Sequence, residues 1–588
     1  MSKIDTVIIK NFRSVKLLKI KLDDLNVFVG KNNAGKTNLL RAIRWFCYPD
    51  EELKPDNFFD ENKDIEICCR VVDIDDGKVN ELKERLSTLG KCINNNCVWL
   101  RRVVHAPQEL PSGMFSDLTE TWYAEDRVKV DSSQLGWIRS TNVTEGDIRN
   151  ILPKVFYLST NSESFGREND RQEGNTFLNL ISYVMRISGV DFNVDSKNRK
   201  DNVKLINNKK ITDNIVCKLN KNLNDIIGNN LLQIQIVTVE SDQKTGTNPV
   251  ICFDEKNISR LPENFGQGLM RMAQMAVIKL LADIRNVKGQ DSLLLIDEPE
   301  ISLYPQIVEE VAQAIVDICS GRCFQSIICT HSPVFVRNPS LIFNTRIVKK
   351  HGGVTRIVPR KQDFCVIVNE KAAQYDIAIN LENLSYALFA DVVLLVEGQT
   401  EKIVLPKILK SMANIENLSV AVVDAMSCNN ISGLRDILDG IGLTVFVVQD
   451  FDVLQKSCYS KFDGYDEFRL KLDDYAKKNN FTKGTLSARD LTGFLSDETN
   501  RNASRKIIDS LKKEGIWVWP LGDIESVIYG RVVPNKDKVS EARNFIDKIV
   551  EEDCFKVIDN QGGSGRGMED FCSWLTQGFH KQTESILL

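Results

Sequence analysis

The sequence predicts an α/β protein in which two parallel-sheet domains follow one another in a single chain. First, 588 residues exceed what one hydrophobic core fills, and this length favours roughly three or four units of domain size. Second, the stretch Gly-Lys-Asn-Asn-Ala-Gly-Lys-Thr at 30–37 lies between an apolar strand and the start of a helix. Third, continuous apolar runs at 392–396, 419–423 and 444–448 alternate with helical patterns, which is typical of a sheet buried on both faces.

The composition is that of an ordinary globular protein. Hydrophobic residues make up 42% and charged residues 27% of the chain, and no apolar run approaches the roughly 18 residues that cross a bilayer. The chain enters a strand at 6–9 and then the stretch at 30–37, which leaves no room for a removable signal peptide. Many of the 15 cysteines lie in apolar runs, as reduced and buried thiols do. We therefore expect a cytoplasmic protein with no membrane span.

The net charge limits how the chain can meet nucleic acid. A formal charge of -5 does not favour binding a polyanion over the whole surface, so any DNA contact must come from local patches. The clearest basic segment runs over 197–221. A solvated helical insertion explains this segment at least as well.

The first domain alternates strands and helices around one insertion. Strands are expected at 17–22, 66–72 and 98–104, and the apolar period becomes helical at 177–185 and 211–227. Strands return at 232–239, 249–253, 293–296, 326–329 and 342–348, with a long helix at 268–284. The expected domains are 1–164 and 231–366 as two parts of one nucleotide-binding domain, 165–230 as a helical insertion, 367–390 as a connector, and 391–588 as the second α/β domain with a C-terminal tail.

Residues 30–37 have the composition of a phosphate-binding loop. Glycines let backbone N–H groups close on phosphate oxygens, Lys36 supplies a positive charge to the β- and γ-phosphates, and Thr37 offers a hydroxyl to Mg²⁺. This spacing predicts an ATP site with a bound Mg²⁺ ion. The candidate nucleotide-binding residues of the loop are Gly30, Asn32, Asn33, Gly35, Lys36 and Thr37.

A second strand end supplies the acidic half of a nucleotide site. The run Leu-Leu-Leu-Ile-Asp-Glu-Pro-Glu at 293–300 places Asp297 where it would orient the metal and Glu298 where it would act on the attacking water. His331, in Cys-Thr-His-Ser-Pro at 329–333, ends a further strand and could sense the γ-phosphate. A capped strand end is the alternative interpretation of His331.

These motifs, with Asn-Phe-Arg-Ser at 11–14 and Leu-Tyr-Pro at 303–305, resemble the ABC-type ATPases of the RecF/SMC kind. The resemblance implies two nucleotide sites across a head-to-head dimer, each closed by a signature motif from the partner. The matching segment is 264–271, where Gly266, Gly268 and a helix N-terminus would meet the γ-phosphate. Gln267 stands where serine is usual and Met270 where glutamine is usual. We therefore expect nucleotide binding with slow hydrolysis.

Carboxylates gather in the second α/β domain. Glu397 ends the apolar run at 392–396, Glu401 follows at a helix start, and Asp450 and Asp452 end the run at 444–448. The Asp pair shares a face if the chain stays extended. Because the carboxyl ends of neighbouring parallel strands meet in one crevice, these four residues should converge there. Hard oxygen ligands suit Mg²⁺ or Mn²⁺, and two such ions about 4 Å apart would cleave a phosphodiester.

The order of these acidic motifs resembles the Toprim domain of topoisomerases, primases and certain nucleases. In the nuclease branch a further acidic site follows the next strand, which makes Asp523 and Glu525 candidate ligands of a second metal ion. Acidic turns of this kind also serve as helix N-caps. A basic residue near the domain end would stabilise the transition state. Arg566, in the Gly-rich stretch 561–567 expected to be a loop, and Lys556 are candidates, although a mobile surface loop is the stronger interpretation.

An ABC-type ATPase followed by a Toprim domain is the architecture of the OLD (overcoming lysogenization defect) nucleases. That family includes the Gabija A subunit and OLD-type effectors associated with some retrons. The resemblance implies an ATP-regulated, divalent-metal-dependent DNA endonuclease in anti-phage defence. It also implies a homodimer or tetramer assembled through the ATPase domain, often with the helical insertion. A helicase-like subunit, or a retron reverse transcriptase with its DNA, would be the defence-system partner.

The alternative is a RecF/SMC-like ATP-dependent repair scaffold whose Toprim domain binds DNA or partners without cutting. A topoisomerase is disfavoured because it needs a positioned tyrosine nucleophile, and none of the 11 tyrosines has a recognisable context. A primase is disfavoured because the chain lacks a convincing zinc module.

Overall fold

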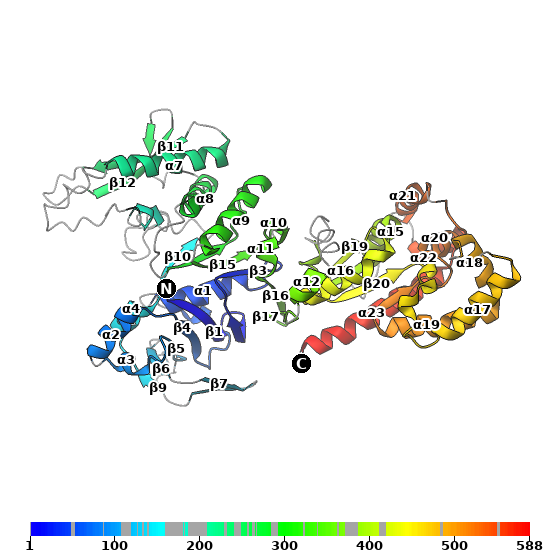
Figure 1. Ribbon diagram of the computed structural model, residues 1–588, viewed down its shortest axis with the longest axis horizontal. Coiled ribbons are helices and arrows are strands. Elements are labelled where there is room, and N and C mark those ends of the chain that lie inside the picture. Colours follow the sequence, from blue (N-terminus) through cyan, green and yellow to red (C-terminus); the bar gives the residue numbers. More distant parts are fainter. Residues whose placement is uncertain are drawn as a thin grey trace. The chain divides into compact units, whose positions relative to one another are not determined.

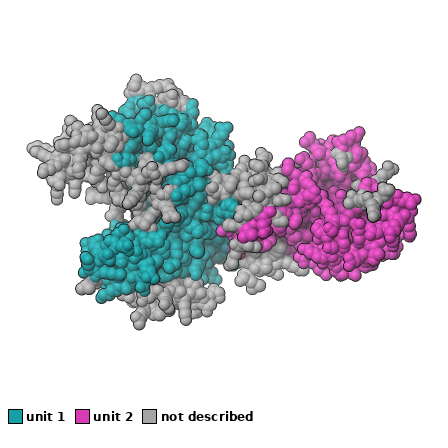
Figure 2. Space-filling view, in the orientation of Figure 1, with its two compact units in different colours: residues 1–358 teal, residues 359–588 magenta. Residues whose placement is uncertain are grey.

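The chain forms two compact units, Met1–Val358 and Pro359–Leu588, which Figure 2 shows in different colours. The structure is a computed structural model. It describes residues 2–48, 53–85, 87–107, 119–125, 128–131, 134–137, 140–158, 180–181, 183–185, 188, 209–228, 232–239, 248–255, 258–260, 265, 267–283, 292–320, 324–337, 339–361, 364–370, 386–410, 419–481, 486–534, 536–549 and 553–587.

A six-stranded sheet in the order β10-β14-β15-β3-β16-β17 forms the centre of the N-terminal unit (Figure 1). The first five strands are parallel and the last pairs antiparallel. Their bounds are β10 (Lys154–Leu158), β14 (Ser292–Asp297), β15 (Gln325–Thr330), β3 (Leu25–Val29), β16 (Thr345–His351) and β17 (Val354–Ile357). Every residue of β3, β14 and β15 is buried, as expected of continuous apolar strands covered on both faces. The carboxyl ends of these three strands therefore form one shared edge.

Helices cover this parallel sheet. The helix after the phosphate loop, α1 (Lys36–Cys47), buries Leu39, Leu40, Ile43 and Phe46 along one face. The other helices of this part are α8 (Gln267–Asp283), α9 (Pro305–Ser320), α10 (Pro333–Arg337) and α11 (Pro339–Ile342). Because α1 begins at the carboxyl end of β3, its N-terminus points toward the edge where β14 and β15 also end.

An antiparallel sheet in the order β2-β1-β4-β5-β6-β9 completes the β-rich lobe. Its strands are β2 (Val15–Lys21), β1 (Lys3–Phe12), β4 (Ile65–Val72), β5 (Val98–Val104), β6 (Glu120–Glu125) and β9 (Ser140–Asn142). The helices α2 (Asp76–Glu84), α3 (Thr88–Cys92) and α4 (Glu145–Ile151) and the hairpin of β7 (Val128–Asp131) and β8 (Gln134–Trp137) belong to the same lobe. Both sheets contribute to one hydrophobic core, which includes Ile4, Phe28, Phe46 and Leu295.

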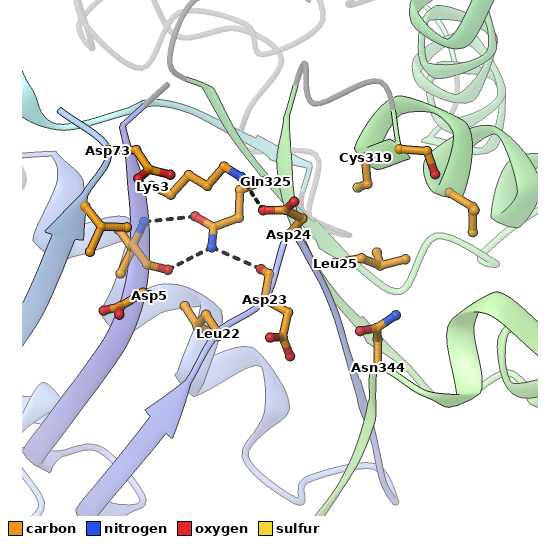
Figure 3. Close-up of a pocket in the computed structure, with 14 residues that line it drawn as sticks. Lys3, Asp5, Leu22, Asp23, Asp24, Leu25, Asp73, Cys319, Gln325 and Asn344 are labelled. Carbon is orange, nitrogen blue, oxygen red and sulfur yellow. Dashed lines mark hydrogen bonds and ion pairs between the residues drawn. The ribbon is translucent and has the colours of Figure 1, made fainter. Parts of the chain in front are cut away.

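Gln325 joins the two sheets beside a cavity of about 680 Å³ (Figure 3). The side chain is 2% exposed; its amide donates to the carbonyls of Ile4 (2.7 Å) and Asp23 (3.1 Å), and its oxygen accepts from Ile4 N (3.1 Å). Lys3 and Asp24 form an ion pair at 2.5 Å on the same wall. Gln325 and Leu25 begin their strands, so this cavity lies at the opposite sheet edge from the phosphate loop.

The described part of the expected insertion is helical. It includes α7 (Lys209–Ile227), which packs against α8 and the strand β11 (Leu232–Val239). β11 pairs antiparallel with β12 (Asn248–Glu255), which pairs with β13 (Ile258–Arg260). Most of the expected insertion at 165–230, including residues 197–208 of the basic segment, lies outside the described residues.

The C-terminal unit contains a four-stranded parallel sheet in the order β19-β18-β20-β21 (Figure 1). The strands are β19 (Val420–Asp424), β18 (Val392–Val396), β20 (Val445–Gln449) and β21 (Ile516–Val518). The helices are α12 (Phe364–Glu370), α15 (Gln399–Lys410), α16 (Cys428–Ile441), α17 (Tyr465–Lys478), α18 (Ala488–Leu495), α19 (Glu498–Lys513), α20 (Ile524–Tyr529), α21 (Lys538–Ile549), α22 (Cys554–Asn560) and α23 (Gly565–Leu587). The expected loop at 561–567 is shorter than predicted, because α23 begins at Gly565.

Within the described ranges, no helix is both long and apolar enough to span a membrane.

The backbone at Gly35 allows a sharp test of the phosphate loop. Gly35 has φ +97°, and a Cβ there would lie 1.9 Å from Thr355 Oγ1, which is itself fixed by Ser14 Oγ at 2.7 Å. Gly353 also has positive φ (+82°), but a Cβ there meets no atom within 4 Å. Gly353→Ala should cost about 1 kcal/mol of stability and Gly35→Ala about 3 kcal/mol, because only the second adds a clash to backbone strain. Thermal unfolding of both variants checks this; equal shifts in midpoint would contradict the clash.

Candidate active site

The phosphate loop closes around its own lysine. Lys36 is 4% exposed, and its Nζ donates to the carbonyls of Gly30 (2.7 Å) and Lys31 (3.0 Å). A Cβ at Gly30 would lie 2.2 Å from the Val348 carbonyl oxygen, so the backbone approaches its neighbour closely there. Asn33 has φ +65° and Asn32 is exposed. The loop thus has the tight, glycine-dependent cradle that phosphate binding needs.

The two candidate Mg²⁺ ligands of this site lie together. Thr37 Oγ1 donates to Asp297 Oδ1 at 3.2 Å, which joins the start of α1 to the end of β14. Burial raises the pKa of Asp297 to about 6, while the hydrogen bond from Thr37 lowers it. A hydroxyl and a carboxylate in contact are oxygen donors of the type that Mg²⁺ binds beside phosphates.

Glu298 and His331 also meet at this edge. Glu298 has φ +50°, and its N–H donates to the Cys329 carbonyl at 2.7 Å. His331 Nδ1 lies 3.3 Å from Glu298 Oε1 and 3.3 Å from Glu300 Oε1. Glu300 Oε1 also accepts from Thr330 Oγ1 (2.7 Å) and from His331 N (2.9 Å). Glu300 therefore caps the end of β15, and a γ-phosphate-sensing role for His331 stays a prediction.

Arg271 is a positioning residue that the sequence did not reveal. It lies on α8, is 5% exposed, and donates to the backbone carbonyls of Asp297 and Glu298, the latter at 2.8 Å. Burial lowers the pKa of Arg271 to about 10, while Glu300 and Asp297 raise it. Gly268, one turn earlier, lies against Ser302, whose Cβ would be 3.3 Å from an added methyl group. Gly266 lies outside the described residues.

The C-terminal unit gathers its carboxylates at one edge of its sheet. Glu397 directly follows β18 and Asp450 directly follows β20, and these strands are parallel neighbours with Val396 opposite Val448. Glu401 lies in the first turn of α15. Asp523 and Glu525 lie at the start of α20, after the adjacent strand β21. We call Glu397, Glu401, Asp450, Asp452, Asp523 and Glu525 the carboxylate cluster.

The pKa shifts indicate that Asp450 lies close enough to four other members of this cluster to feel their charges. Burial raises the pKa of Asp450 well above its ordinary value, and the charges of Glu401, Glu397, Asp523 and Glu525 raise it further. Burial raises the pKa of Glu397 to about 7, with an added effect from Asp452, and that of Glu401 to about 8, with an added effect from Glu525. Burial is the largest cause of each shift, and the neighbouring negative charges add to it.

One atom at this edge has no partner of its own. Asp450 Oδ1 is buried and has no hydrogen bond to any described residue. An orphaned carboxylate oxygen among further carboxylates has the donor chemistry of a Mg²⁺ or Mn²⁺ ligand. Even so, the described residues contain no group of three or more His, Cys, Asp or Glu side chains already arranged to hold a metal ion. The carboxylate oxygens are thus the right type of ligand for Mg²⁺ or Mn²⁺, and the side chains would have to move closer together to bind the ion.

The expected placement of Asp452 is wrong in one respect. The chain does not stay extended after β20 but enters a 3₁₀ helix, η5 (Phe451–Gln455), at the residue after Asp450. Asp452 is therefore exposed and does not share a strand face with Asp450. It still acts on the cluster, because its charge raises the pKa of Glu397.

Lys538 is the second residue that the sequence did not reveal. Its Nζ lies 3.1 Å from Asp523 Oδ2 and 3.1 Å from Glu525 Oε1. Burial lowers the pKa of Lys538, but the two carboxylates outweigh this effect, so the net shift is upward. The candidates Arg566 and Lys556 are exposed on α23 and α22. Lys538 begins α21 in a stretch without a motif, so only the folded chain brings it to the cluster.

Asp523 and Glu525 have local partners as well as a place in the cluster. Asp523 caps α20, because its Oδ1 accepts from Ser526 N at 2.8 Å. Glu525 Oε1 accepts from Thr400 Oγ1 at 2.8 Å. The capping alternative for Asp523 therefore holds, and a role in binding a second metal ion requires exchange with Lys538.

Two family models match this chain, one in its N-terminal unit and one in its C-terminal unit. Residues 2–103 and 115–336, more than half of the chain, match a family model described as an AAA ATPase domain. Residues 388–452 match the TOPRIM domain of overcoming lysogenization defect protein-like sequences. The chain belongs to the family of this AAA ATPase domain and also carries an OLD-like TOPRIM domain. An ATPase domain is thus followed by a Toprim domain, and the residues matched to the Toprim domain include Glu397, Glu401, Asp450 and Asp452 of the carboxylate cluster. The protein is an enzyme.

Two relatives are similar to this chain over nearly its whole length. The Old nuclease of Escherichia phage P2 is 24% identical and covers 97% of this chain and 100% of its own. The endonuclease GajA of Bacillus cereus (strain VD045) is 22% identical, and the match covers 95% of this chain and 97% of GajA. Among solved structures, the Smc head domain with an extended coiled coil from Pyrococcus furiosus is 14% identical, covers 63% of this chain and 100% of its own, and has a TM-score of 0.37.

Removing one negative charge from the cluster should stabilise the metal-free protein. Asp450→Asn keeps the side-chain shape but relieves repulsion from its neighbours, so we expect a gain of about 1 kcal/mol in EDTA, seen as a higher midpoint of thermal unfolding. Mg²⁺ or Mn²⁺ should raise the midpoint of the wild type more than that of the variant. Asp474→Asn, on the exposed side of α17, is the matched control and should change neither value. A destabilised Asp450→Asn protein would contradict the repulsion.

Proposed function

We propose that this protein is a DNA endonuclease that cleaves phosphodiester bonds at the carboxylate cluster with Mg²⁺ or Mn²⁺ bound. The observation that carries the proposal is the convergence of acidic side chains from three adjacent parallel strands on Asp450, whose Oδ1 is buried without a hydrogen bond. Its OLD-family relatives are named as nucleases, which supports the same activity.

The side chains of the cluster divide into holding and positioning roles. Glu397, Glu401, Asp450 and Asp452 would hold the metal, and Asp523 and Glu525 would join them where a second ion binds. Such ions activate a water molecule and stabilise the leaving oxygen of a phosphodiester. Gln449 Nε2 donates to Glu397 Oε1 at 3.3 Å and the Gln449 oxygen accepts from Tyr459, which orients Glu397. Lys538 would hold Asp523 and Glu525 in place through its two ion pairs.

The nucleotide site is proposed to regulate cleavage. The loop, the contact of Thr37 with Asp297, and the placement of Glu298 beside His331 all fit bound ATP with Mg²⁺. Hydrolysis is proposed to be slow, because Gln267 and Met270 replace the usual signature residues. We further propose a homodimer or tetramer formed through the ATPase domain, a cytoplasmic location and a role in anti-phage defence.

The nuclease proposal is tested on supercoiled plasmid with Mg²⁺ or Mn²⁺. Wild-type protein should nick or linearise the plasmid, EDTA should stop the reaction, and Asp450→Ala should lower the rate by at least about a hundredfold, since it removes the central ligand. Asp474→Asn serves as the control of unchanged activity. A protein that binds the plasmid but shows no metal-dependent cleavage beyond that of Asp450→Ala would be the repair scaffold instead.

Regulation by nucleotide is tested with Lys36→Ala, which removes the phosphate-binding charge. The variant should bind a fluorescent ATP analogue at least about tenfold more weakly, and any difference in cleavage between samples with and without ATP should disappear. Lys350→Ala removes an exposed lysine of β16 and should retain both properties. An ATP effect on cleavage that survives in Lys36→Ala would rule out control through this loop.

A further inference from the structure

Lys456 lies beside a different part of the carboxylate cluster from Lys538. It follows η5, and its backbone N–H donates to the Val453 carbonyl at 2.9 Å. Its charge lowers the pKa of both Glu397 and Asp452, and among charged groups it has the largest effect on Asp452. Lys456 is thus near Glu397 and Asp452, two of the four members of the cluster with which Lys538 forms no ion pair.

The contacts of Lys456 leave its positive charge unpaired. Its Nζ lies 2.7 Å from Cys428 Sγ and 3.1 Å from Asn429 Oδ1. Lys538, by contrast, lies 3.1 Å from each of two carboxylates. Among the described residues, no carboxylate forms an ion pair with Lys456. A half-buried ammonium group without a carboxylate partner keeps the charge that an anionic ligand requires.

Hydrogen bonds anchor both sides of the Lys456 contact. The preceding Gln455 is buried, and its side chain bonds Leu486 N (2.7 Å) and Leu486 O (3.1 Å). On the other side, Ala425 N donates to Val396 O at 2.9 Å, and Asn430 Nδ2 donates to Ala425 O at 3.0 Å. These bonds hold the first turn of α16, which carries Cys428 and Asn429, next to the end of β18, where Glu397 follows.

We infer that Lys456 binds a phosphate group of the DNA strand at the carboxylate cluster, and that Cys428 and Asn429 position it. The inference rests on the proposed nuclease function. A cluster of six carboxylates repels a polyanion, so a phosphate can approach only where positive charge is available. Of the two lysines beside the cluster, Lys538 is already held in ion pairs with two carboxylates, whereas Lys456 is not. A lysine–phosphate contact of this kind fixes the register of the strand without reading its sequence.

The test measures equilibrium binding of the full chain to a fluorescently labelled DNA duplex over a series of salt concentrations. Ca²⁺ replaces Mg²⁺ as a hard oxygen-binding cation. Lys456→Ala should weaken binding about three- to tenfold and reduce the slope of log affinity against log salt by about 0.9, which is the loss of one phosphate contact. Lys456→Arg should restore most of the slope. Thermal unfolding confirms that each variant is folded, and Lys456→Gln replaces Lys456→Ala if that variant is not.

Matched variants separate a phosphate contact from other roles. Lys477→Ala, which removes an exposed lysine at the end of α17, should leave affinity and slope unchanged. Cys428→Ala and Asn429→Ala should weaken binding by a smaller factor with the slope retained, because the charge remains but is less well placed. An unchanged slope in Lys456→Ala, or a loss of cleavage rate with unchanged binding, overturns the inference. Absence of cleavage by the wild type overturns the nuclease proposal alone, because the salt slope does not depend on cleavage.

Discussion

Repulsion between carboxylates at one sheet edge is the constraint on which the C-terminal unit depends. Parallel pairing of β18 with β20 places Glu397 and Asp450 side by side, and neither strand can shift without moving its buried apolar residues off the core. The hydrophobic core beneath the sheet supplies the opposing free energy. It includes Trp517, Trp519 and Phe571, whose rings lie within 5.8 Å of one another. The fold thus holds like charges together that would separate in solution.

The two sites differ in how their charges are compensated. In the ATPase unit, Lys36 is bonded to the loop, Thr37 donates to Asp297, and Arg271 supports the backbone behind Asp297 and Glu298. Its polar groups are therefore held in place before a ligand arrives. In the Toprim unit, Asp450 has neighbours of its own charge and one oxygen without a hydrogen bond. This contrast is expected if a bound nucleotide replaces the existing contacts of Lys36 in the ATPase unit. In the Toprim unit, a bound cation would instead supply the positive charge that the carboxylates lack.

Sequence patterns located the strand-end residues because neighbouring parallel strands end at the same edge. This rule is enough to bring Glu397 to Asp450 and the phosphate loop to Asp297. It does not reach long side chains that arrive from elements without a motif, such as Lys538. It also fails where the backbone leaves the strand, as at Asp452, because a 3₁₀ turn directly after a strand has no distinct apolar period. Local caps, like that of Asp523, were recognised only as alternatives.

An acidic chain can act on DNA only if charge is compensated locally. The net charge is -5, and the residues nearest the proposed chemistry are themselves acidic, so long-range attraction does not bring a phosphate to this edge. Cations and the lysines beside the cluster must therefore serve binding as well as chemistry. A metal ion that is needed for substrate approach links affinity to catalysis, because the protein without it repels the strand that it would cut. Such a site is inactive without its cation for two reasons. The ion that activates water is missing, and the uncompensated carboxylates repel the DNA strand.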